Sequence, residues 1–471
     1  MKLNYKRTIL VGFAFFLISA FWQAYDAIVP LILNHHFGLP DTVSGAVMSL
    51  DNILAVFLLP LFGSLSDKVN TRFGKRTPFI LFGAVAAAVA FFSLTFIDNF
   101  QLSLLPTGEY AVLLEAAVSD EARDKLLGEI AARSLEITLA NPLPLIGFIG
   151  LLLVVLLAMA TFRSPAVALM PDVTIKPLRS KGNAIINLIG AAGGVLVLVL
   201  GMIFATSKNK YMSYSWYVIA VIGIMLAALA VFVLKVKENE WAAEMEAETE
   251  RLGLNAPAEE AKAEDMRSLS KPELISLILI LASVALWYIG YNSITSKYSV
   301  YATNELGFDY NFTLIVAQAA AIASYIPVGI IASKIGRKKT ILAGIVMLAS
   351  AFFIGNFITP TTPEIIMYPV FMLAGMGWAT INVNSFPMVV ELARGGDVGK
   401  YTGYYYTASM AAQIVAPILS GFLYSAFGMR LMFFAFGTVF VALSFVTMFF
   451  VKHGDAKPQP KQVIDDLADA D

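Results

Sequence analysis

Twelve long apolar segments constrain the fold of this chain more than any other feature. Each holds about the 20 mainly apolar residues that a helix needs to cross a bilayer. The segments lie near residues 8–33, 43–65, 77–97, 143–170, 183–206, 214–235, 273–301, 311–333, 339–358, 364–390, 401–425 and 430–451. In lipid the backbone must satisfy its own hydrogen bonds. We therefore expect an all-α membrane protein with twelve transmembrane helices.

Lysine and arginine are unevenly distributed between the two sides of these segments. If both termini are cytoplasmic, 25 of the 33 basic residues lie in cytoplasmic segments, 6 lie outside, and two (Arg163 and Lys297) lie within spans. Cytoplasmic loops of membrane proteins carry such an excess. The pattern predicts a multi-pass protein of the cell membrane with cytoplasmic N- and C-termini.

The composition excludes several other classes of protein. Only 14% of the residues are charged, against about 25% in soluble domains. The net charge of −1 does not indicate a nucleic-acid partner. The chain has no cysteine and three scattered histidines. No metal-ligand spacing, nucleophile elbow or phosphate loop is present. We expect no enzyme, no cofactor and no bound metal.

Two pairs of connecting segments resemble each other. GSLSDKVNTRFGKRTPF (63–79) is echoed by GIIASKIGRKKT (329–340), and the segment at 171–183 loosely matches the one at 387–400. We therefore predict two six-helix pseudo-repeats, an arrangement known in transporters. The predicted parts are residues 1–235 with an external insertion at 98–142, a cytoplasmic linker at 236–271, the second half at 272–452, and a disordered tail at 453–471.

Two of these predicted parts contain helical patterns outside the membrane spans. The insertion at 98–142 holds an acidic amphipathic stretch, which predicts one or two short surface helices. A packed cap is favoured there over a substrate-filtering lid. The linker contains WAAEMEAETERL, which predicts a helix along the membrane face.

The segment at 63–79 resembles the loop signature of the major facilitator superfamily. Its RFGKRTPF ending, with RSPAVALMPD (163–172) and RSKGNAIINLIGAAGG (179–194), resembles the glycoside–pentoside–hexuronide:cation symporters. The likeness is closer to the plant sucrose-transporter branch than to the melibiose branch. The resemblance implies the major facilitator fold and an alternating-access sugar symporter driven by a cation gradient.

The same resemblance assigns a conformational latch to the basic loops. Its residues are Gly63, Asp67, Arg72, Gly74, Lys75 and Arg76 and, in the second copy, Gly336, Arg337 and Lys338. Gly63 permits close helix packing, and Asp67 offers a carboxylate to a helix N-terminus or to the basic residues. A loop that serves only to orient the chain in the membrane is the alternative.

Three charged residues lie in the first-half spans. A charge at the bilayer centre costs at least about 2.5–3.5 kcal/mol on insertion scales, so such residues usually face a cavity and pair. Asp26, with Trp22, Gln23 and Tyr25 beside it, is our first choice as a sugar or proton ligand, over a structural acid. Asp51 either carries the proton or caps its helix, and the residues leave both readings open. Arg163 is favoured as their charge partner over a snorkelling anchor.

Two further observations bear on the coupling ion and on the basic residues. Ala55 and Leu59 stand where melibiose-type members carry two sodium-binding aspartates, which favours protons over sodium. Val167 stands at the position of the sucrose transporters' helix-4 arginine, and Arg163 lies one turn earlier on the same face. Lys297, near the outer end of its span, is expected to snorkel rather than serve the site.

Neutral polar and aromatic side chains dominate the second half. Amides and aromatic rings suit a neutral polyol, which needs paired hydrogen bonds and a ring to stack on. The candidate substrate-binding residues there are Tyr288, Asn292, Trp378, Asn382, Asn384 and Gln413.

These patterns favour a proton-coupled symporter of a glucoside or disaccharide. Its expected partners are a small sugar, a coupling cation and the lipid bilayer, and it is expected to act as a monomer. Proton-driven efflux of a drug or metabolite is one alternative, and a nontransporting membrane sensor is another.

Overall fold

The computed structural model describes residues 3–116, 120–174, 179–207, 210–251, 270–390, 392 and 398–454. The regular secondary structure of this part of the chain is helical, apart from an isolated bridge between Thr71 and Gly74. Eleven of its helical stretches are long and apolar enough to cross a membrane. The all-α membrane fold is confirmed, and the remaining predicted span overlaps α13 (Tyr310–Ile335).

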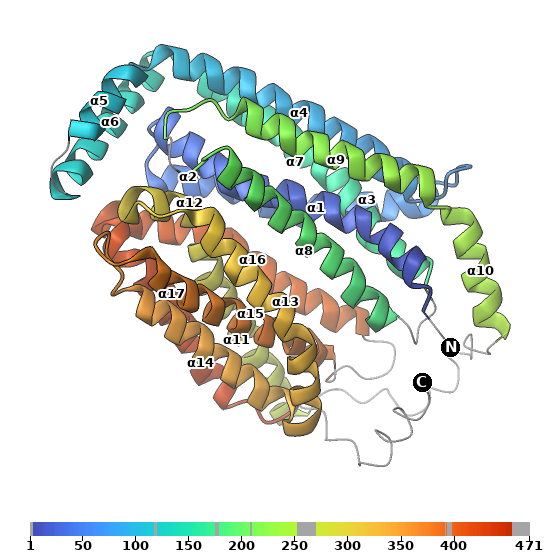
Figure 1. The fold of residues 1–471 in the computed structure, drawn as a ribbon. Helices are drawn as coiled ribbons and strands as arrows, with labels where there is room; N and C mark the ends of the chain where they lie inside the picture. Colours follow the sequence, from blue (N-terminus) through green and yellow to red (C-terminus); the bar gives the residue numbers. More distant parts are fainter. Residues whose placement is uncertain are drawn as a thin grey trace. The chain divides into compact units, whose positions relative to one another are not determined.

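The chain forms two compact units (Figure 1). Unit 1 comprises Met1–Ala256, Ser296–Phe312 and Pro417–Arg430, and unit 2 comprises Pro257–Thr295, Thr313–Ala416 and Leu431–Asp471. Two stretches of the second half of the chain therefore pack with the first half. The predicted division at 235, 271 and 452 stays a prediction, and most of the predicted tail (455–471) lies outside the described residues.

Unit 1 contains all of the described first-half helices. They are α1 (Tyr5–Leu31), the π-helical turn η1 (Ile32–His36), α2 (Asp41–Met48), α3 (Leu50–Lys68), α4 (Thr77–Leu104), α5 (Thr107–Ala116), α6 (Asp120–Ala140), α7 (Leu143–Asp172), α8 (Arg179–Ile203), α9 (Ser215–Lys235) and α10 (Glu238–Arg251). The short α12 (Tyr298–Tyr301) and η3 (Ala302–Leu306) also belong to it.

Unit 2 is built from second-half helices. They are α11 (Lys271–Thr295), most of α13, α14 (Arg337–Gly355), η4 (Glu364–Ile366), α15 (Met367–Val390), most of α16 (Val398–Phe427) and most of α17 (Met429–Phe449).

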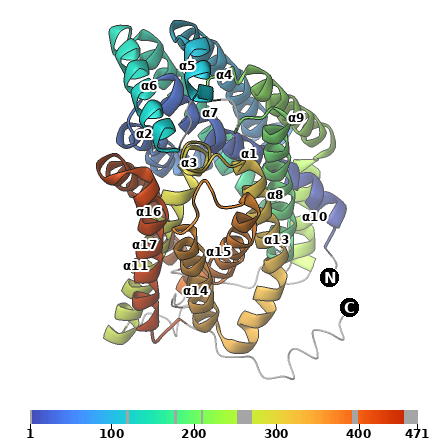
Figure 2. The ribbon, with the colours of Figure 1, turned by 60° about the vertical axis from the view of Figure 1, so that its left-hand side comes forward.

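Small residues bring the helices of unit 1 close together. A Cβ at Gly193 of α8 would lie 2.8 Å from the carbonyl oxygen of Phe16 of α1, and one at Gly83 of α4 would lie 2.8 Å from the Cβ of Phe162 of α7. Helices in lipid gain little from apolar burial and associate through such close packing. The pairs α1–α8 and α4–α7 accordingly run side by side (Figures 1 and 2).

The predicted insertion forms helices, α5 and α6, at the end of α4 (Figure 1). Leu105, Tyr110 and Ile130 make a small core between them. Thr138 of α6 donates to the carbonyl oxygen of Phe37 (3.0 Å), and Gln101 of α4 donates to Thr138 (2.9 Å). The pair is therefore packed onto the bundle, as expected of a cap.

Candidate functional site

Three of the predicted site residues of unit 1 line one small cavity. Trp22, Asp51 and Arg163 surround a space of about 10 Å³, close to the room that one water needs. The guanidinium carbon of Arg163 lies 5.4 Å from the centre of the Trp22 ring, a cation–π arrangement. Arg163 also acts electrostatically on Asp51. Ala55 and Leu59 complete the apolar wall of the cavity.

Tyr25 and Asp26 follow Trp22 on α1, and the Tyr25 ring meets the Trp22 ring edge-on at 5.3 Å. The negative charges of Asp26 and Asp51 lie near enough to interact, and both act on Tyr25. Tyr25 is fully buried, and its hydroxyl, like the indole N–H of Trp22, has no hydrogen-bond partner among the described residues. Orphaned buried donors are uncommon and point to water or a ligand. Gln23, the residue after Trp22 on α1, is half-buried.

In unit 2, predicted site residues take part in an aromatic stack. The rings of Tyr291 and Trp378 are parallel, with centroids 3.7 Å apart, and Tyr288 meets Trp378 edge-on at 5.2 Å. The hydroxyl of Tyr405 lies 2.9 Å from that of Ser385 and also bonds to Tyr288. Aromatic and hydroxyl groups from α11, α15 and α16 are thereby joined.

The predicted amides of unit 2 are held by their own helices. Asn292 donates to the carbonyl oxygen of Tyr288 (2.8 Å), and Asn384 donates to that of Thr380 (2.9 Å). Gln413 donates to the carbonyl oxygen of Ser409 (3.2 Å). Each amide has an oxygen acceptor in addition to this donor. Asn382 is half-buried, one turn from Trp378.

The predicted latch is centred on Arg76 in unit 1. Its guanidinium donates to Asp67 at the end of α3 (2.5 Å) and to Asp172 at the end of α7 (2.8 Å). Burial acts to lower the pKa of Arg76, but these two carboxylates outweigh it and raise that pKa above its ordinary value. A Cβ at Gly63 would lie 2.8 Å from the Ser164 hydroxyl, so this glycine allows α3 to approach α7.

The other basic side chains of the two loops make contacts of their own. Arg72 is exposed, 4.7 Å from the Phe73 ring, and the Lys75 side chain is exposed. In the second copy, Gly336 has a φ of 94° before α14, and Arg337 donates to the carbonyl oxygen of Pro387 (3.4 Å). Lys338 donates to the carbonyl oxygens of Phe449 and Val451 at the end of α17 (2.8 and 2.6 Å).

Glu238 holds the loop of the predicted latch, and the sequence pattern did not reveal this contact. Its buried carboxylate accepts the backbone N–H groups of Lys75 (2.6 Å), Arg76 (2.8 Å) and Thr77 (2.8 Å), and the Thr77 hydroxyl (2.8 Å). A carboxylate at a helix N-terminus also meets the positive end of the helix dipole. Gly74, with a φ of 114°, is needed here because a Cβ would overlap this carboxylate.

Glu238→Gln should lower the free energy of unfolding by about 2 kcal/mol, because hydrogen bonds to a charged acceptor are worth roughly 1.5–3 kcal/mol. The amide keeps the shape but loses the charge and one acceptor. Glu240→Gln is the matched control, since Glu240 makes only a surface pair with Lys237. Thermal unfolding in detergent measures both variants. Equal midpoints would contradict the assignment.

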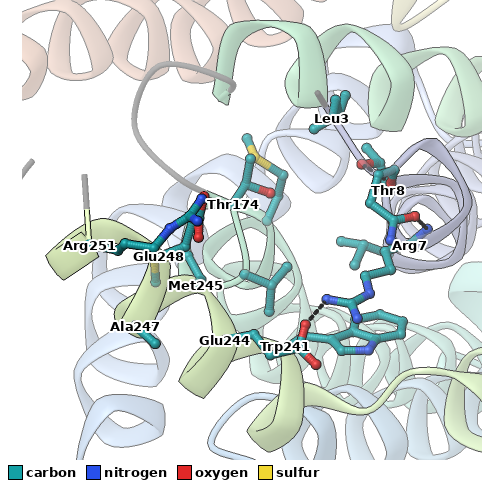
Figure 3. Close-up of a pocket in the computed structure, with 14 residues that line it drawn as sticks. Leu3, Arg7, Thr8, Thr174, Trp241, Glu244, Met245, Ala247, Glu248 and Arg251 are labelled. Atoms are coloured by element: carbon teal, nitrogen blue, oxygen red, sulfur yellow. Dashed lines mark hydrogen bonds and ion pairs between the residues drawn. The ribbon is translucent and has the colours of Figure 1, made fainter. Parts of the chain in front are cut away.

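α10 also encloses a cavity of about 520 Å³ with the start of α1 and the end of α7 (Figure 3). Arg7 forms an ion pair with Glu244 (2.5 Å) and lies 5.3 Å from the centre of the Trp241 ring. The hydrogen bond from Arg7 lowers the pKa of the Glu244 carboxyl. None of the predicted substrate-binding residues lines this cavity, so it is separate from the candidate site.

The expectation that Lys297 snorkels is wrong. α11 ends at Thr295, and Lys297 lies in the break before α12. Its side chain is 0% exposed and its ammonium lies 3.1 Å from the Asp41 carboxylate. A buried cation needs such a partner. The partner lies 256 residues earlier in the chain, so the local pattern around Lys297 could not reveal it.

Comparison with known protein families gives two matches. The model described as Major Facilitator Superfamily matches residues 130–393 and 312–466. The model described as MFS/sugar transport protein matches residues 10–115.

Known proteins resemble the chain locally in sequence and throughout in fold. Human proton-associated sugar transporter A is 38% identical over 86 residues, 18% of this chain and 11% of that protein. Human solute carrier family 45 member 4 is 30% identical over 118 residues, 23% of this chain and 15% of that protein. The chain thus matches under a sixth of each relative's length. The inward-open xylose transporter XylE from E. coli has a TM-score of 0.61 and 13% identity, covering 98% of this chain and 100% of that one.

Proposed function

Because this chain belongs to the Major Facilitator Superfamily, we propose that it is a proton-coupled sugar symporter that works by alternating access. The observation that carries the proposal is the group of Asp26, Asp51 and Arg163 inside a bundle of membrane helices. The local likeness to a proton-associated sugar transporter supports it. The proposal places both termini in the cytoplasm, following the distribution of basic residues.

Proton coupling is supported by the walls of the cavity beside Asp51. A bound sodium ion needs several oxygen ligands, as hard cations do. Ala55 and Leu59 instead present apolar side chains to this cavity. A carboxylate that alternates between a half-buried and a hydrated setting can take up and release a proton. Asp26 and Asp51 are the proposed proton carriers, and Arg163 is their charge partner.

In unit 2, sugar binding is assigned to the aromatic stack and the amides. In unit 1, the proposed sugar ligands are Trp22, Gln23, Tyr25 and Asp26. Tyr291, Trp378 and Tyr288 offer ring faces and edges to the apolar face of a pyranose. The amide oxygens of Asn292, Asn384 and Gln413 can accept from sugar hydroxyls, because their N–H groups already bond to their own helices. Such a set suits an uncharged polyol.

Trp378→Ala should weaken sugar binding about tenfold, since stacked aromatic contacts are worth roughly 0.5–1.5 kcal/mol beyond their buried area. Trp378→Phe should retain more affinity because it keeps a ring. Trp216→Ala is the control, because Trp216 is 71% exposed on α9. The concentration dependence of sugar exchange in proteoliposomes measures the effect. If the half-saturating sugar concentration is unchanged in Trp378→Ala, the stack is not part of the sugar-binding site.

The latch is proposed to act on the conformational equilibrium rather than on the sugar site. Arg76 joins the ends of α3 and α7 through Asp67 and Asp172, and Glu238 ties the same loop to α10. A contact present in only one conformation biases the equilibrium by its differential free energy.

A panel of sugars in sealed proteoliposomes tests the proposed function. With an imposed pH gradient, at least one glucoside or disaccharide should accumulate, with proton movement into the lumen. A sodium gradient alone should drive none. Strict sodium dependence would contradict proton coupling, and export of drugs without sugar movement would contradict the substrate class.

A further inference from the structure

Unit 1 joins three outer helix ends of the first half to two stretches of the second half. The stretches are 296–312, which contains α12 and η3, and 417–430, the end of α16 with the turn after it. The first-half ends lie beside residues 34–42, 207 and 210–213, in the connections that the charge pattern places outside the cell. In an alternating-access transporter such contacts must break when the external side opens.

An ion-pair network lies at the centre of these contacts. Lys297 donates to the Asp41 carboxylate (3.1 Å) and to the amide oxygen of Asn34 (3.4 Å). Asn34 donates to the same carboxylate oxygen (3.1 Å), and Ser44 donates to the Asn34 amide oxygen (3.3 Å). Lys297 is 0% exposed and the Asp41 side chain 18% exposed. The two charges therefore pair directly only while the two segments stay together.

The backbones of α2 and α16 touch directly beside this network. A Cβ at Gly45 would overlap the carbonyl oxygen of Pro417, and one at Gly421 would overlap that of Asp41. Thr42 donates its N–H and its hydroxyl to the Ser425 hydroxyl (3.4 and 3.2 Å). The two glycines thus permit an approach that any side chain would prevent.

Two further contacts join the ends of α1 and α8 to the second half. The Nε2 of His35 lies 2.8 Å from the amide oxygen of Asn304, in η3. The hydroxyls of Thr206 and Tyr310 lie 2.5 Å apart, and a Cβ at Gly201 would overlap the Asn311 side chain. Within unit 1, the stretches 296–312 and 417–430 are therefore contacted from α2, from the end of α1 and from the end of α8.

We propose that this network is the external gate in its closed state, and that the Lys297–Asp41 pair holds it shut. The inference rests on the proposed function and identifies the external gate that alternating access requires. An ion pair suits a contact that must open repeatedly, because water solvates each charge separately once the segments part. An apolar plug of the same size would instead expose its surface to water at every opening.

A single cysteine can report whether this gate opens, since the chain contains no cysteine. Ser299 is 3% exposed and its hydroxyl lies 3.5 Å from the Asp26 carbonyl oxygen across the contact. In Ser299→Cys, an impermeant thiol reagent added outside sealed vesicles should react slowly. Adding Asp41→Asn should speed the reaction roughly tenfold, within the usual range of conformational coupling.

The charge-exchanged double variant Asp41→Lys with Lys297→Asp should restore slow labelling, because it re-forms the ion pair with the charges exchanged. Glu109→Gln is the control, because Glu109 pairs with Arg133 on the exposed surface of the insertion. Unchanged labelling in Asp41→Asn would overturn the gate. This readout needs no substrate, so it decides the gate even if no sugar or proton movement is found.

A cross-link provides a second measurement that does not depend on removing a charge. Bridging Thr42→Cys to Ser425→Cys with a short reducible reagent should stop sugar exchange, and reduction should restore it. Asn99→Cys with Ser215→Cys is the control bridge, because both residues lie in the first half, 2.8 Å apart. Exchange that continues at the wild-type rate through a bridged gate would overturn the proposal.

Discussion

Asp26→Asn should abolish concentrative sugar uptake and reduce internal sugar to passive equilibration. The amide keeps the shape and hydrogen-bonding capacity of the carboxyl group but cannot exchange a proton at any accessible pH. Asp26 lies on α1 next to Tyr25 and within electrostatic reach of Asp51. Loss of its charge therefore removes the step at which the proton gradient is coupled to the sugar.

Exchange of labelled sugar across the membrane separates the two roles of Asp26. If the carboxylate only carries the proton, exchange should continue in Asp26→Asn. If it also holds sugar hydroxyls, exchange should fail as well. Glu109→Gln, an exposed acid on α5, serves as the control. Near-normal accumulation in Asp26→Asn would reduce Asp26 to a structural acid.

Arg163→Ala should lower driven uptake roughly thirtyfold, equivalent to about 2 kcal/mol. Breaking a fully buried charge pair costs about 3–5 kcal/mol, and Arg163 is half-buried beside Trp22 and Asp51. Without the guanidinium, a nearby carboxylate holds its proton more tightly. The remaining uptake should therefore have its optimum at higher pH.

Arg163→Lys distinguishes charge from geometry at the same position. The ammonium retains the charge but not the planar guanidinium that lies over the Trp22 ring. Uptake should fall between wild type and Arg163→Ala, with the pH optimum near that of wild type. Arg133→Ala, on the exposed surface of α6, is the control. An unchanged rate and optimum in Arg163→Ala would make Arg163 an anchor.

The charged candidate residues could be picked out of the sequence because a charge within an apolar span is conspicuous. Asp26, Asp51 and Arg163 stand out for this reason, and the structure brings Asp51 and Arg163 to one cavity with Trp22. The amides and tyrosines of the second half do not stand out in this way. Polar neutral residues are common in membrane helices, and composition does not tell which of them face one another.

The sequence by itself determined that this protein is a bundle of membrane-spanning helices with a helical insertion. The sequence shows directly how long each apolar segment is and how the charged loops are spaced, because these are properties of short stretches of chain. A backbone that crosses lipid must also form its own hydrogen bonds, which makes each such segment a helix. Only the tertiary structure decided which groups that are far apart along the chain contact each other. Glu238 meets the loop at Arg76 across 162 residues, Lys297 meets Asp41 across 256, and Trp378 stacks on Tyr291. Such pairs form because a charge or polar group buried in the bundle must find its partner in three dimensions, and separation along the chain does not limit that choice.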